Sequence, residues 1–403
     1  MDIRRIRQDF PMLQEGSGRK TLTYFDTACQ SLRPKSVIEA INQYYLKSSA
    51  CSGRSMHQLA AEVTRSTDQA RTAVAKFLGA AKKEEIVFTR NTTEGINLVA
   101  NSLSLQKGDV VLISDKEHNS NLIPWQILAK KKGVRIRFVP SLPDNTFSLE
   151  AFEKCLDPSV KLVSLGFTSN LDGVTIPAAE VIQRAHQNGA WVLLDAAQTA
   201  PHHKINVKAL DVDFLALSGH KMLGPSGTGV LYGKYQLLEE LEPFLVGGDT
   251  VATSTYESCE FLPPPEKFEA GLQDYAGIMG LGAAVKYLQD VGFDAIQKQE
   301  LALNEYITAE IKDLPRLKLI GPADPKLRGG IVTFYLEGID SHRIALMLDQ
   351  MANIQVRSGQ HCVHSWFNAH HILGSVRASS YFYNTLEEAA LFVGSLKKIG
   401  KVL

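Results

Sequence analysis

Residues 191–198 read WVLLDAAQ, and residues 214–221 read FLALSGHK. Each stretch opens with four apolar residues and closes with small, polar or charged ones. An apolar run without polar alternation is typical of a strand that is buried on both faces of a parallel sheet. The sequence therefore predicts two buried strands, one of which ends at Asp195, while the other is followed by Lys221.

Similar apolar runs lie on both sides of these two, and segments with helical periodicity separate several of them. One such segment covers residues 58–78, where apolar residues share one face and Gly79 ends the helix. Strands that alternate with helices predict an α/β fold with a large, mostly parallel sheet. Ligands of such sheets bind beyond the carboxyl ends of the strands. The further strands that we expect lie at residues 86–89, 110–114, 135–139, 162–167 and 229–232.

The pattern changes after three consecutive prolines at residues 263–265. Helical patterns follow at 275–288 and 293–314, and we expect no further strand before Gly330. Beyond that residue, the pattern predicts strands at 331–336, 354–357 and 375–380, a helix at 341–351, and a last helix from a capping box at 385–388 to about residue 399.

These changes in pattern predict three parts of the chain. Residues 1–20 form an N-terminal arm that packs with the smaller domain. Residues 21–295 form a large domain that carries the parallel sheet, and residues 296–403 form a smaller α+β domain. The chain is long enough to bury a core of this size without disulfides or a structural metal.

The composition restricts the class of protein. Of 403 residues, 44% are hydrophobic, and Lys plus Arg and Asp plus Glu each number 43, so the formal net charge is zero. A neutral chain without basic blocks offers no electrostatic surface for nucleic acid or for an anionic membrane. The charged start of the chain predicts no signal peptide, and no run reaches the roughly 18–20 apolar residues of a spanning helix.

The chain contains five cysteines, at positions 29, 51, 155, 259 and 362, and no CxxC pair. An odd number of scattered cysteines argues against a disulfide framework and against a zinc cluster. It also argues for a reducing compartment. We therefore expect a cytoplasmic protein without a metal site.

Asp195 and Lys221 are the first residues that indicate chemistry. A carboxylate at the end of an apolar strand is costly unless a cation meets it, although such an aspartate can also simply cap a helix. A lysine after a strand is usually solvated, but Lys221 follows Ser, Gly and His in a glycine-rich turn, where its amine could be desolvated and nucleophilic. Pyridoxal phosphate needs a lysine for its aldehyde and an acidic partner for its pyridine nitrogen, so the pair predicts this cofactor.

The phosphate of such a cofactor needs hydrogen-bond donors, and residues 89–95, TRNTTEG, offer them. A predicted strand runs into a helix here, so backbone N–H groups and the hydroxyls of Thr92 and Thr93 form an anion site. A Thr-Thr pair is otherwise often a simple N-cap. Ser218 and His220 could bind the same phosphate. A nucleotide-binding loop at 224–229 is disfavoured, because no Gly-Lys-[Ser/Thr] ending is present and a strand follows.

Three more polar residues follow strands at the same predicted edge of the sheet. His118 could stack on the pyridine ring, and Asn170 could bind a substrate carboxylate or the ring hydroxyl. Gln198 could bind that hydroxyl from the loop after Asp195. Without these neighbours, a histidine such as His118 would more often be a surface or capping residue.

Residues 356–364, VRSGQHCVH, place a thiol in a loop together with Arg357 and two histidines. Nearby cations make a thiol such as Cys362 more reactive. Arg377 follows fifteen residues later and could bind a carboxylate as a bidentate fork, or form a surface ion pair. Cys29 and Cys51 lie in polar N-terminal loops that could approach the same site.

These segments, in this order, resemble the fold-type I pyridoxal-phosphate enzymes of the class V aminotransferase family. The resemblance is closest to the SUF-type (group II) cysteine desulfurases and selenocysteine lyases, and it covers nearly the whole chain. Its most specific motifs are FTRNTTE (88–94), EH (117–118), PWQ (124–126), SGHK (218–221), FEAG (268–271) and RSGQHC (357–362).

The resemblance implies removal of sulfur from L-cysteine, which yields L-alanine and a persulfide on Cys362 for iron–sulfur cluster or other sulfur-cofactor assembly. Lys221 would hold the cofactor and move the Cα proton, and Cys362 would attack the substrate sulfur. The implied cofactor contacts are Asp195 on the ring nitrogen, Gln198 on the ring oxygen, His118 stacked on the ring, and Thr92, Thr93, Ser218 and His220 on the phosphate. The implied substrate contacts are Asn170 and Arg377 on the carboxylate, with Arg357 beside them and His57 lining the site.

The resemblance also implies a homodimer and a protein that accepts the sulfur. A selenocysteine lyase, or another class V lyase or aminotransferase, is the alternative, because a weaker selenium–carbon bond can break without Cys362. A cofactor-free scaffold protein is disfavoured by the intact pair of Lys221 and Asp195. Leu272 stands where relatives have a threonine that reaches the cofactor phosphate of the partner subunit, so we expect that contact to be absent or replaced.

Overall fold

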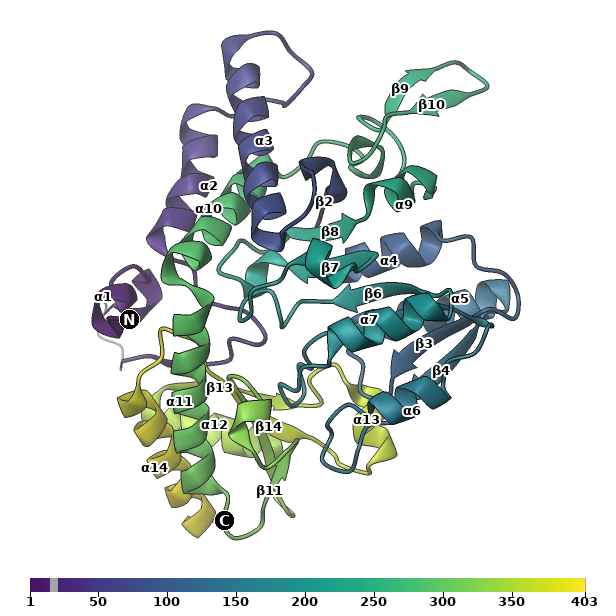
Figure 1. Cartoon of the computed structure of the whole chain (residues 1–403). Helices are drawn as coiled ribbons and strands as arrows, with labels where there is room; N and C mark the ends of the chain where they lie inside the picture. Colours follow the sequence, from purple (N-terminus) through teal and green to yellow (C-terminus); the bar gives the residue numbers. More distant parts are fainter. Residues whose placement is uncertain (15–20, 403) are drawn as a thin grey trace.

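Seven strands form the larger of two main sheets in the computed structural model, which describes residues 1–14 and 21–402 (Figure 1). Their order across the sheet is β2-β8-β7-β6-β5-β3-β4. Strands β3 to β7 are parallel, whereas β8 runs antiparallel to both of its neighbours. The bounds are β2 Ile86–Thr89, β3 Val110–Ser114, β4 Arg135–Val139, β5 Val160–Gly166, β6 Trp191–Asp195, β7 Phe214–Ser218 and β8 Gly229–Gly233. The mostly parallel sheet is confirmed, and its predicted strand ends differ from these by at most two residues.

Helices cover both faces of this sheet (Figure 1). Successive side chains of a strand point to opposite faces, and they join two different hydrophobic cores. One core includes α3 (Gln58–Leu78), α7 (Ala178–Gln187) and α10 (Tyr275–Val291), and the other includes α4 (Thr92–Ser102) and α5 (Ile123–Lys132). The sheet is therefore buried on both sides, and its polar residues collect at the strand ends.

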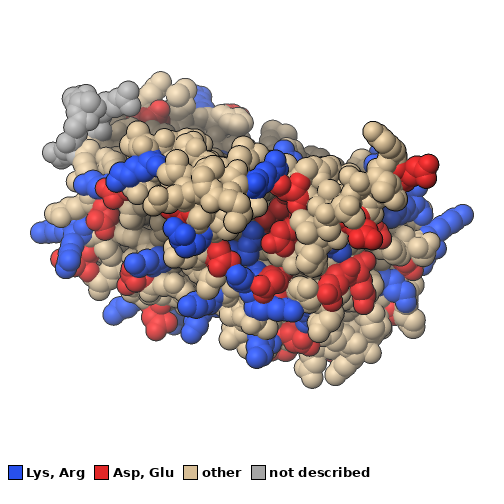
Figure 2. Space-filling model, turned by 90° about the horizontal axis from the view of Figure 1, so that it is seen from above, with Lys and Arg blue, Asp and Glu red and all other residues tan. Residues whose placement is uncertain are grey.

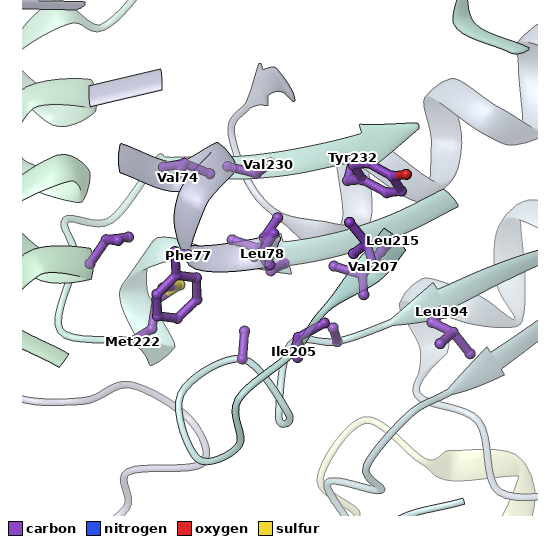
Figure 3. Packing of buried hydrophobic residues seen from close by; sticks show 14 of the residues in the cluster. Val74, Phe77, Leu78, Leu194, Ile205, Val207, Leu215, Met222, Val230 and Tyr232 are labelled. Atoms are coloured by element: carbon purple, nitrogen blue, oxygen red, sulfur yellow. The ribbon is translucent and has the colours of Figure 1, made fainter. Parts of the chain in front are cut away.

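The core between α3 and the sheet explains why residues 58–78 are helical. Val74, Phe77 and Leu78 lie at helical spacing and pack near Leu215 of β7 (Figure 3). Each of these side chains is at most 5% exposed. Burial of apolar surface contributes about 25 cal/mol per Å² to stability. Packing of this kind, more than intrinsic helix propensity, stabilises a helix within a protein. Gly79, with a φ of 68°, ends α3 in the left-handed conformation.

The second sheet has five strands in the order β1-β13-β14-β12-β11. β1 pairs in parallel with β13, and the other pairs are antiparallel. Apolar side chains of α11, α12 and α14 pack against this sheet. The bounds are β1 Thr23–Phe25, α11 Phe293–Ile311, β11 Leu317–Ile320, β12 Ile331–Leu336, α12 Ser341–Ala352, β13 Ile354–Gly359, β14 Ser375–Ser379 and α14 Leu386–Val402. Hydrogen bonds between Thr385 and Glu388 form the predicted capping box.

Several short strands lie outside the prediction from the sequence. β11 falls within the stretch where the pattern predicts no strand before Gly330, so that prediction is wrong. β11 is a four-residue edge strand that pairs with β12 alone, and so short an element carries too little periodicity to recognise. The same holds for β1 and for the hairpin of β9 (Val251–Ser254) and β10 (Cys259–Phe261).

The start of the chain contacts helices that pack against each of the two sheets. Arg7, at the end of α1 (Ile3–Arg7), donates to the carbonyl of Tyr383 over 2.8 Å and pairs with Glu388. The ring of Phe10 lies 5.9 Å from that of Tyr287 in α10. The rest of the predicted arm, residues 15–20, lies outside the described residues. The predicted boundary at residue 295 falls inside α11, and the division into domains remains a prediction.

Charges of both signs are mixed on the face of the molecule that Figure 2 shows. Among residues 1–14 and 21–402, no helix is long and apolar enough to cross a membrane. The same residues contain no cluster of three or more His, Cys, Asp or Glu side chains arranged to hold a metal ion.

Candidate active site

A cavity of about 230 Å³ lies between the carboxyl ends of β3, β5, β6 and β7 and the second sheet. Its wall contains side chains from both sheets, which is the position expected for a ligand of a parallel sheet. The structure brings together all the predicted site residues except His57 and Cys362. The predicted residues that line the cavity are Thr92, Thr93, His118, Asn170, Asp195, Gln198, Ser218, His220, Lys221, Arg357 and Arg377.

Lys221 and Asp195 lie at the carboxyl ends of two adjacent strands. Asp195 ends β6, and Lys221 follows β7 in a single 3-10 turn. One carboxylate oxygen of Asp195 accepts from the N–H of Ala197 over 2.9 Å. Burial raises the pKa of Asp195 and lowers that of Lys221, and the charge of each opposes the shift of the other. The amine of Lys221 has no hydrogen-bond partner in the described part of the chain, so it is free to react with a ligand.

The start of α4 forms one wall of the cavity. Ser218 Oγ lies 2.7 Å from Thr92 Oγ1 and accepts from the backbone N–H of Thr92 over 2.9 Å. Asn91 caps the helix by accepting from the N–H of Glu94 over 3.0 Å. A Cβ on Gly229 would lie 2.6 Å from the Cα of Asn91, so only glycine lets β8 pass this close. The helix N-terminus and two hydroxyls thus converge on one point.

His118 lies in the cavity wall as a neutral imidazole. Its Nδ1 accepts from the N–H of Ser120 over 3.0 Å, so the proton of the neutral ring is on Nε2. Burial, helped by the charges of Lys221, Arg377 and Arg357, lowers its pKa to about 3. The ring therefore stays uncharged at neutral pH, which suits a residue that stacks on an aromatic cofactor.

Glu117 is a buried member of the site to which the sequence analysis assigned no role. It accepts from Ser114 Oγ over 2.6 Å, from the N–H of Gly166 over 3.0 Å and from Asn121 Nδ2 over 2.8 Å. These bonds join the ends of β3 and β5 and fix the loop that carries His118. Burial raises the pKa of Glu117 to about 7, against these hydrogen bonds. The signal for it was its place in the EH motif, three residues after the end of β3.

Arg377 and Asn170 form the wall on the side of the second sheet. Arg377 is 1% exposed, and its Nη1 donates to the carbonyl of Asn170 over 2.8 Å. Its Nε and Nη2 are buried without a hydrogen-bond partner, and Nη2 lies 3.6 Å from Asp26 Oδ1. The Asn170 amide donates to the carbonyl of His361 over 2.8 Å. Two parallel donors of a buried guanidinium therefore remain for an incoming carboxylate.

Cys362 directly follows the cavity-lining residue His361 in the sequence. It lies in a loop with unusual backbone angles. His361 and Cys362 have φ values of 50° and 61°, a left-handed conformation that is costly for residues with a side chain. The loop is held by the Asn170–His361 bond and by the N–H of Asn119, which donates to the Cys362 carbonyl over 2.8 Å. Arg357 Nη2 lies 3.7 Å from the Cys362 sulfur, so the predicted cation beside the thiol is present.

The comparisons with known proteins agree with this geometry. The model of the family described as aminotransferase class-V matches residues 23–392. The chain belongs to this family. A probable cysteine desulfurase of Synechocystis sp. is 42% identical over 397 residues, which cover 97% of this chain and 94% of that protein.

Two solved structures are similar to this class-V chain over nearly its whole length. The apo structure of a cysteine desulfurase from Thermococcus onnurineus has a TM-score of 0.94 at 38% identity and covers 99% of this chain and 98% of its own. The S-sulfonic acid form of a cysteine desulfurase from Escherichia coli has a TM-score of 0.92 at 32% identity, with coverage of 100% and 99%. Each is a relative by sequence as well as by fold.

The cavity of this class-V protein fits pyridoxal phosphate, the cofactor of the family. The Oε1 of Gln198 is buried without a hydrogen-bond partner, while its Nε2 donates to the carbonyl of Ala28 over 2.7 Å. That unpaired oxygen can accept from a ring hydroxyl. Asp195 has a second carboxylate oxygen for a ring N–H, the start of α4 suits a phosphate, and Lys221 has a free amine. The donor set thus matches each polar group of the cofactor.

In this class-V chain, the FEAG motif (residues 268–271) has a structural role. Glu269 forms a bidentate ion pair with Arg71 of α3, at 2.7 and 2.8 Å, and accepts from the N–H of Phe88 over 2.7 Å. These bonds hold α3 against β2, whose end leads into α4. Leu272, directly after the motif, is 62% exposed, so within this chain it contributes no cofactor contact.

His57 does not reach the cavity within this chain. It is exposed and caps α3, because its Nδ1 accepts from the N–H of Ala60 over 3.2 Å. Histidine is not among the preferred N-cap residues, which is why the sequence did not indicate this role. Cys51 also lies outside the cavity wall, whereas Cys29 is part of it.

Proposed function

We propose that this protein is a cysteine desulfurase that uses pyridoxal phosphate to convert L-cysteine into L-alanine and a persulfide on Cys362. The observation that carries the proposal is the position of Cys362, directly after His361 and 3.7 Å from Arg357, both of which line the same cavity as Lys221 and Asp195. Curated relatives that are 38–42% identical over nearly the whole chain bear the name cysteine desulfurase. A reactive thiol at this position can capture the sulfur atom that the substrate loses.

In this proposal, the residues of the large sheet handle the proton and the charge. Bound pyridoxal phosphate withdraws electrons from Cα of the amino acid, which makes the Cα proton acidic and lets the bond to sulfur break. Lys221 holds the cofactor and moves the Cα proton, which requires a neutral amine, and burial favours that form. Asp195 keeps the ring nitrogen protonated, Gln198 binds the ring oxygen, and His118 stacks on the ring. Thr92, Thr93, Ser218 and His220 bind the phosphate.

The residues of the second sheet hold the amino acid and receive the sulfur. Arg377 binds the substrate carboxylate through Nε and Nη2, which make no hydrogen bond within the described chain, although Nη2 also lies 3.6 Å from Asp26. Asn170 lies beside it. The Cys362 thiolate attacks the substrate sulfur, a new S–S bond forms, and the C–S bond breaks, with its electron pair passing to the carbon side. The short, fixed loop brings the thiol to the cavity without a long excursion. His57 has no role in this scheme within one chain.

The proposal includes the setting that the family resemblance implies. The protein acts as a homodimer in the cytoplasm, and a protein acceptor takes the persulfide sulfur for iron–sulfur cluster or other sulfur-cofactor assembly. The three predicted parts, 1–20, 21–295 and 296–403, are the arm, the cofactor-binding domain and the cysteine-bearing domain. Sedimentation of the holoenzyme tests the dimer.

Alanine release from L-cysteine in the presence of a reductant tests the function. We expect steady turnover by the native protein and by Cys155→Ala, a control outside the cavity, and loss of turnover in Cys362→Ala by at least about 100-fold. L-Selenocysteine is the second substrate in the same assay. Alanine from L-cysteine at the native rate in Cys362→Ala would contradict the desulfurase, and turnover of L-selenocysteine but not of L-cysteine by the native protein would support the selenocysteine lyase. No alanine from the native protein would refute both.

A further inference from the structure

Cys29 is a second thiol in the active-site cavity, and the proposed function gives it no role. It lies in the cavity wall with Lys221 and Arg377, in a loop that follows β1. The N–H of Ala28 donates to Ser379 Oγ over 3.0 Å, and the carbonyl of Ala28 accepts from Gln198. The residue before Cys29 is therefore tied both to the second sheet and to the cofactor side, which restricts the position of Cys29.

One guanidinium lies between Cys29 and Cys362. Arg357 Nη1 lies 2.8 Å from the Cys29 sulfur, and Arg357 Nη2 lies 3.7 Å from the Cys362 sulfur. The two terminal nitrogens of a guanidinium are rigidly coplanar. Arg357 can therefore stabilise negative charge on either sulfur without moving, so one cation serves both the attacking and the leaving thiolate of a transfer between them.

The other three cysteines have no such arrangement. Cys155 donates to the carbonyl of Phe138 over 3.7 Å and does not line the cavity. Cys51 and Cys259 do not line the cavity. A shared cation is thus particular to Cys29 and Cys362 among the cysteines, all of which lie in the described part of the chain.

We propose that Cys29 is a second sulfur-carrying thiol, which takes the outer sulfur of the persulfide formed on Cys362. The inference rests on the proposed function, because that function supplies the persulfide. The Cys29 thiolate attacks the outer sulfur, a new S–S bond forms at Cys29, and the S–S bond at Cys362 breaks. The electron pair passes to Cys362, which becomes a thiolate beside Arg357. No oxidant or reductant is required, because one persulfide and one thiolate become one thiolate and one persulfide.

The transfer frees Cys362 for a second turnover before any acceptor arrives. Each protomer then stores two sulfur atoms instead of one. A protein that keeps Cys362 but lacks Cys29 stops after the first. The difference is a doubling of the first burst of alanine, and a merely structural role of Cys29 would not produce it.

The experiment uses the reduced holoenzyme, freed of reductant and mixed with a small molar excess of L-cysteine. Alanine is counted per protomer, and persulfides are trapped by alkylation and located by peptide mass spectrometry. We expect about two alanines and labelled persulfide on both Cys29 and Cys362 in the native protein. Cys29→Ser should give about one alanine, with persulfide on Cys362 alone, and Cys155→Ser should match the native protein.

Cys362→Ala decides the direction of transfer. We expect no persulfide on Cys29 in this variant, because sulfur arrives there only through Cys362. Persulfide on Cys29 in Cys362→Ala, or equal bursts with persulfide on Cys362 alone in the native protein and Cys29→Ser, would overturn the inference. An absence of alanine from the native protein would instead refute the proposed function, so the two failures are distinguishable.

Discussion

The two ends of the active-site cavity are built from different kinds of structure. Lys221 and Asp195 follow buried parallel strands, and their neighbours are fixed by short hydrogen bonds to strand ends. Cys362 stands on a loop with two consecutive residues in the left-handed region, and a single arginine holds its sulfur together with that of Cys29. The comparison teaches that strand ends suit the groups that hold a cofactor, whereas a short loop that is held by hydrogen bonds suits a thiol that must face the substrate.

The strongest way to break the cofactor end is Lys221→Ala. Without the amine, nothing holds the cofactor aldehyde or moves the Cα proton, so we expect alanine release to fall by about 10⁴-fold. The absorbance of bound cofactor in the visible range should change at the same time. The exposed Lys208→Ala is the control. Retention of more than a tenth of native activity by Lys221→Ala would refute the role of the lysine.

Asp195→Asn keeps the shape of the cofactor end and removes its charge. An amide cannot hold a protonated ring nitrogen, so we expect kcat to fall by about 10²–10³-fold, the usual cost of losing one aligned electrostatic partner. Asp195→Glu should recover part of that loss. Steady-state kinetics at saturating cofactor separate this effect from weaker cofactor binding. Equal kcat in native protein and Asp195→Asn would contradict the assignment.

Arg357→Lys sharpens the comparison at the cysteine end. Lysine keeps the positive charge, but a single ammonium cannot donate along two fixed directions to two sulfurs. We expect alanine release to fall by about 10-fold with an unchanged cofactor spectrum. The exposed Arg343→Lys serves as the matched control. A changed cofactor spectrum in Arg357→Lys would mean that this arginine belongs to the cofactor end instead.

Glu117→Gln tests the cofactor end through the free energy of unfolding. Its expected effect is the smallest of these predictions. The folded state raises the pKa of Glu117 from 4.5 to about 7, so between these values the folded protein binds a proton that the unfolded chain does not. Stability therefore falls as the pH rises through this window. Relative to the native protein, we expect Glu117→Gln to gain up to about 3 kcal/mol in its free energy of unfolding between pH 5 and pH 8.

Urea unfolding at the two pH values measures that gain, with the exposed Glu305→Gln as control. A parallel loss of stability in native protein and Glu117→Gln would show that Glu117 does not titrate in this window. The same result would mean that its hydrogen bonds to Ser114, Asn121 and Gly166 keep it ionised throughout.

The sequence predicts the cofactor end of the cavity better than the cysteine end. Asp195 and Lys221 follow continuous apolar runs, and the carboxyl ends of parallel strands meet at one edge, so strand pattern alone brings them together. The contact between Arg357 and Cys29 joins residues 328 positions apart, and it depends on how β1 and β13 pair. No local pattern marks a three-residue strand such as β1, so this contact was not predictable.

Glu117 and His57 show two further limits. The hydrogen bonds of Glu117 come from three separate segments, and only their packing shows that the carboxylate is structural. His57 is predicted from the resemblance to line the site, but in this chain its ring caps α3. A role inferred from a matching motif depends on neighbours that the motif does not include.

The most direct test of the account separates the two ends of the cavity in one sample. L-Cysteine is added to Cys362→Ala holoenzyme, and the cofactor absorption spectrum and alanine release are recorded together. The account predicts the same spectral change on addition of L-cysteine as in native protein, while alanine release falls by at least about 100-fold. An unchanged spectrum, or alanine at the native rate, would contradict the central claim that the lysine end binds the amino acid and Cys362 removes its sulfur.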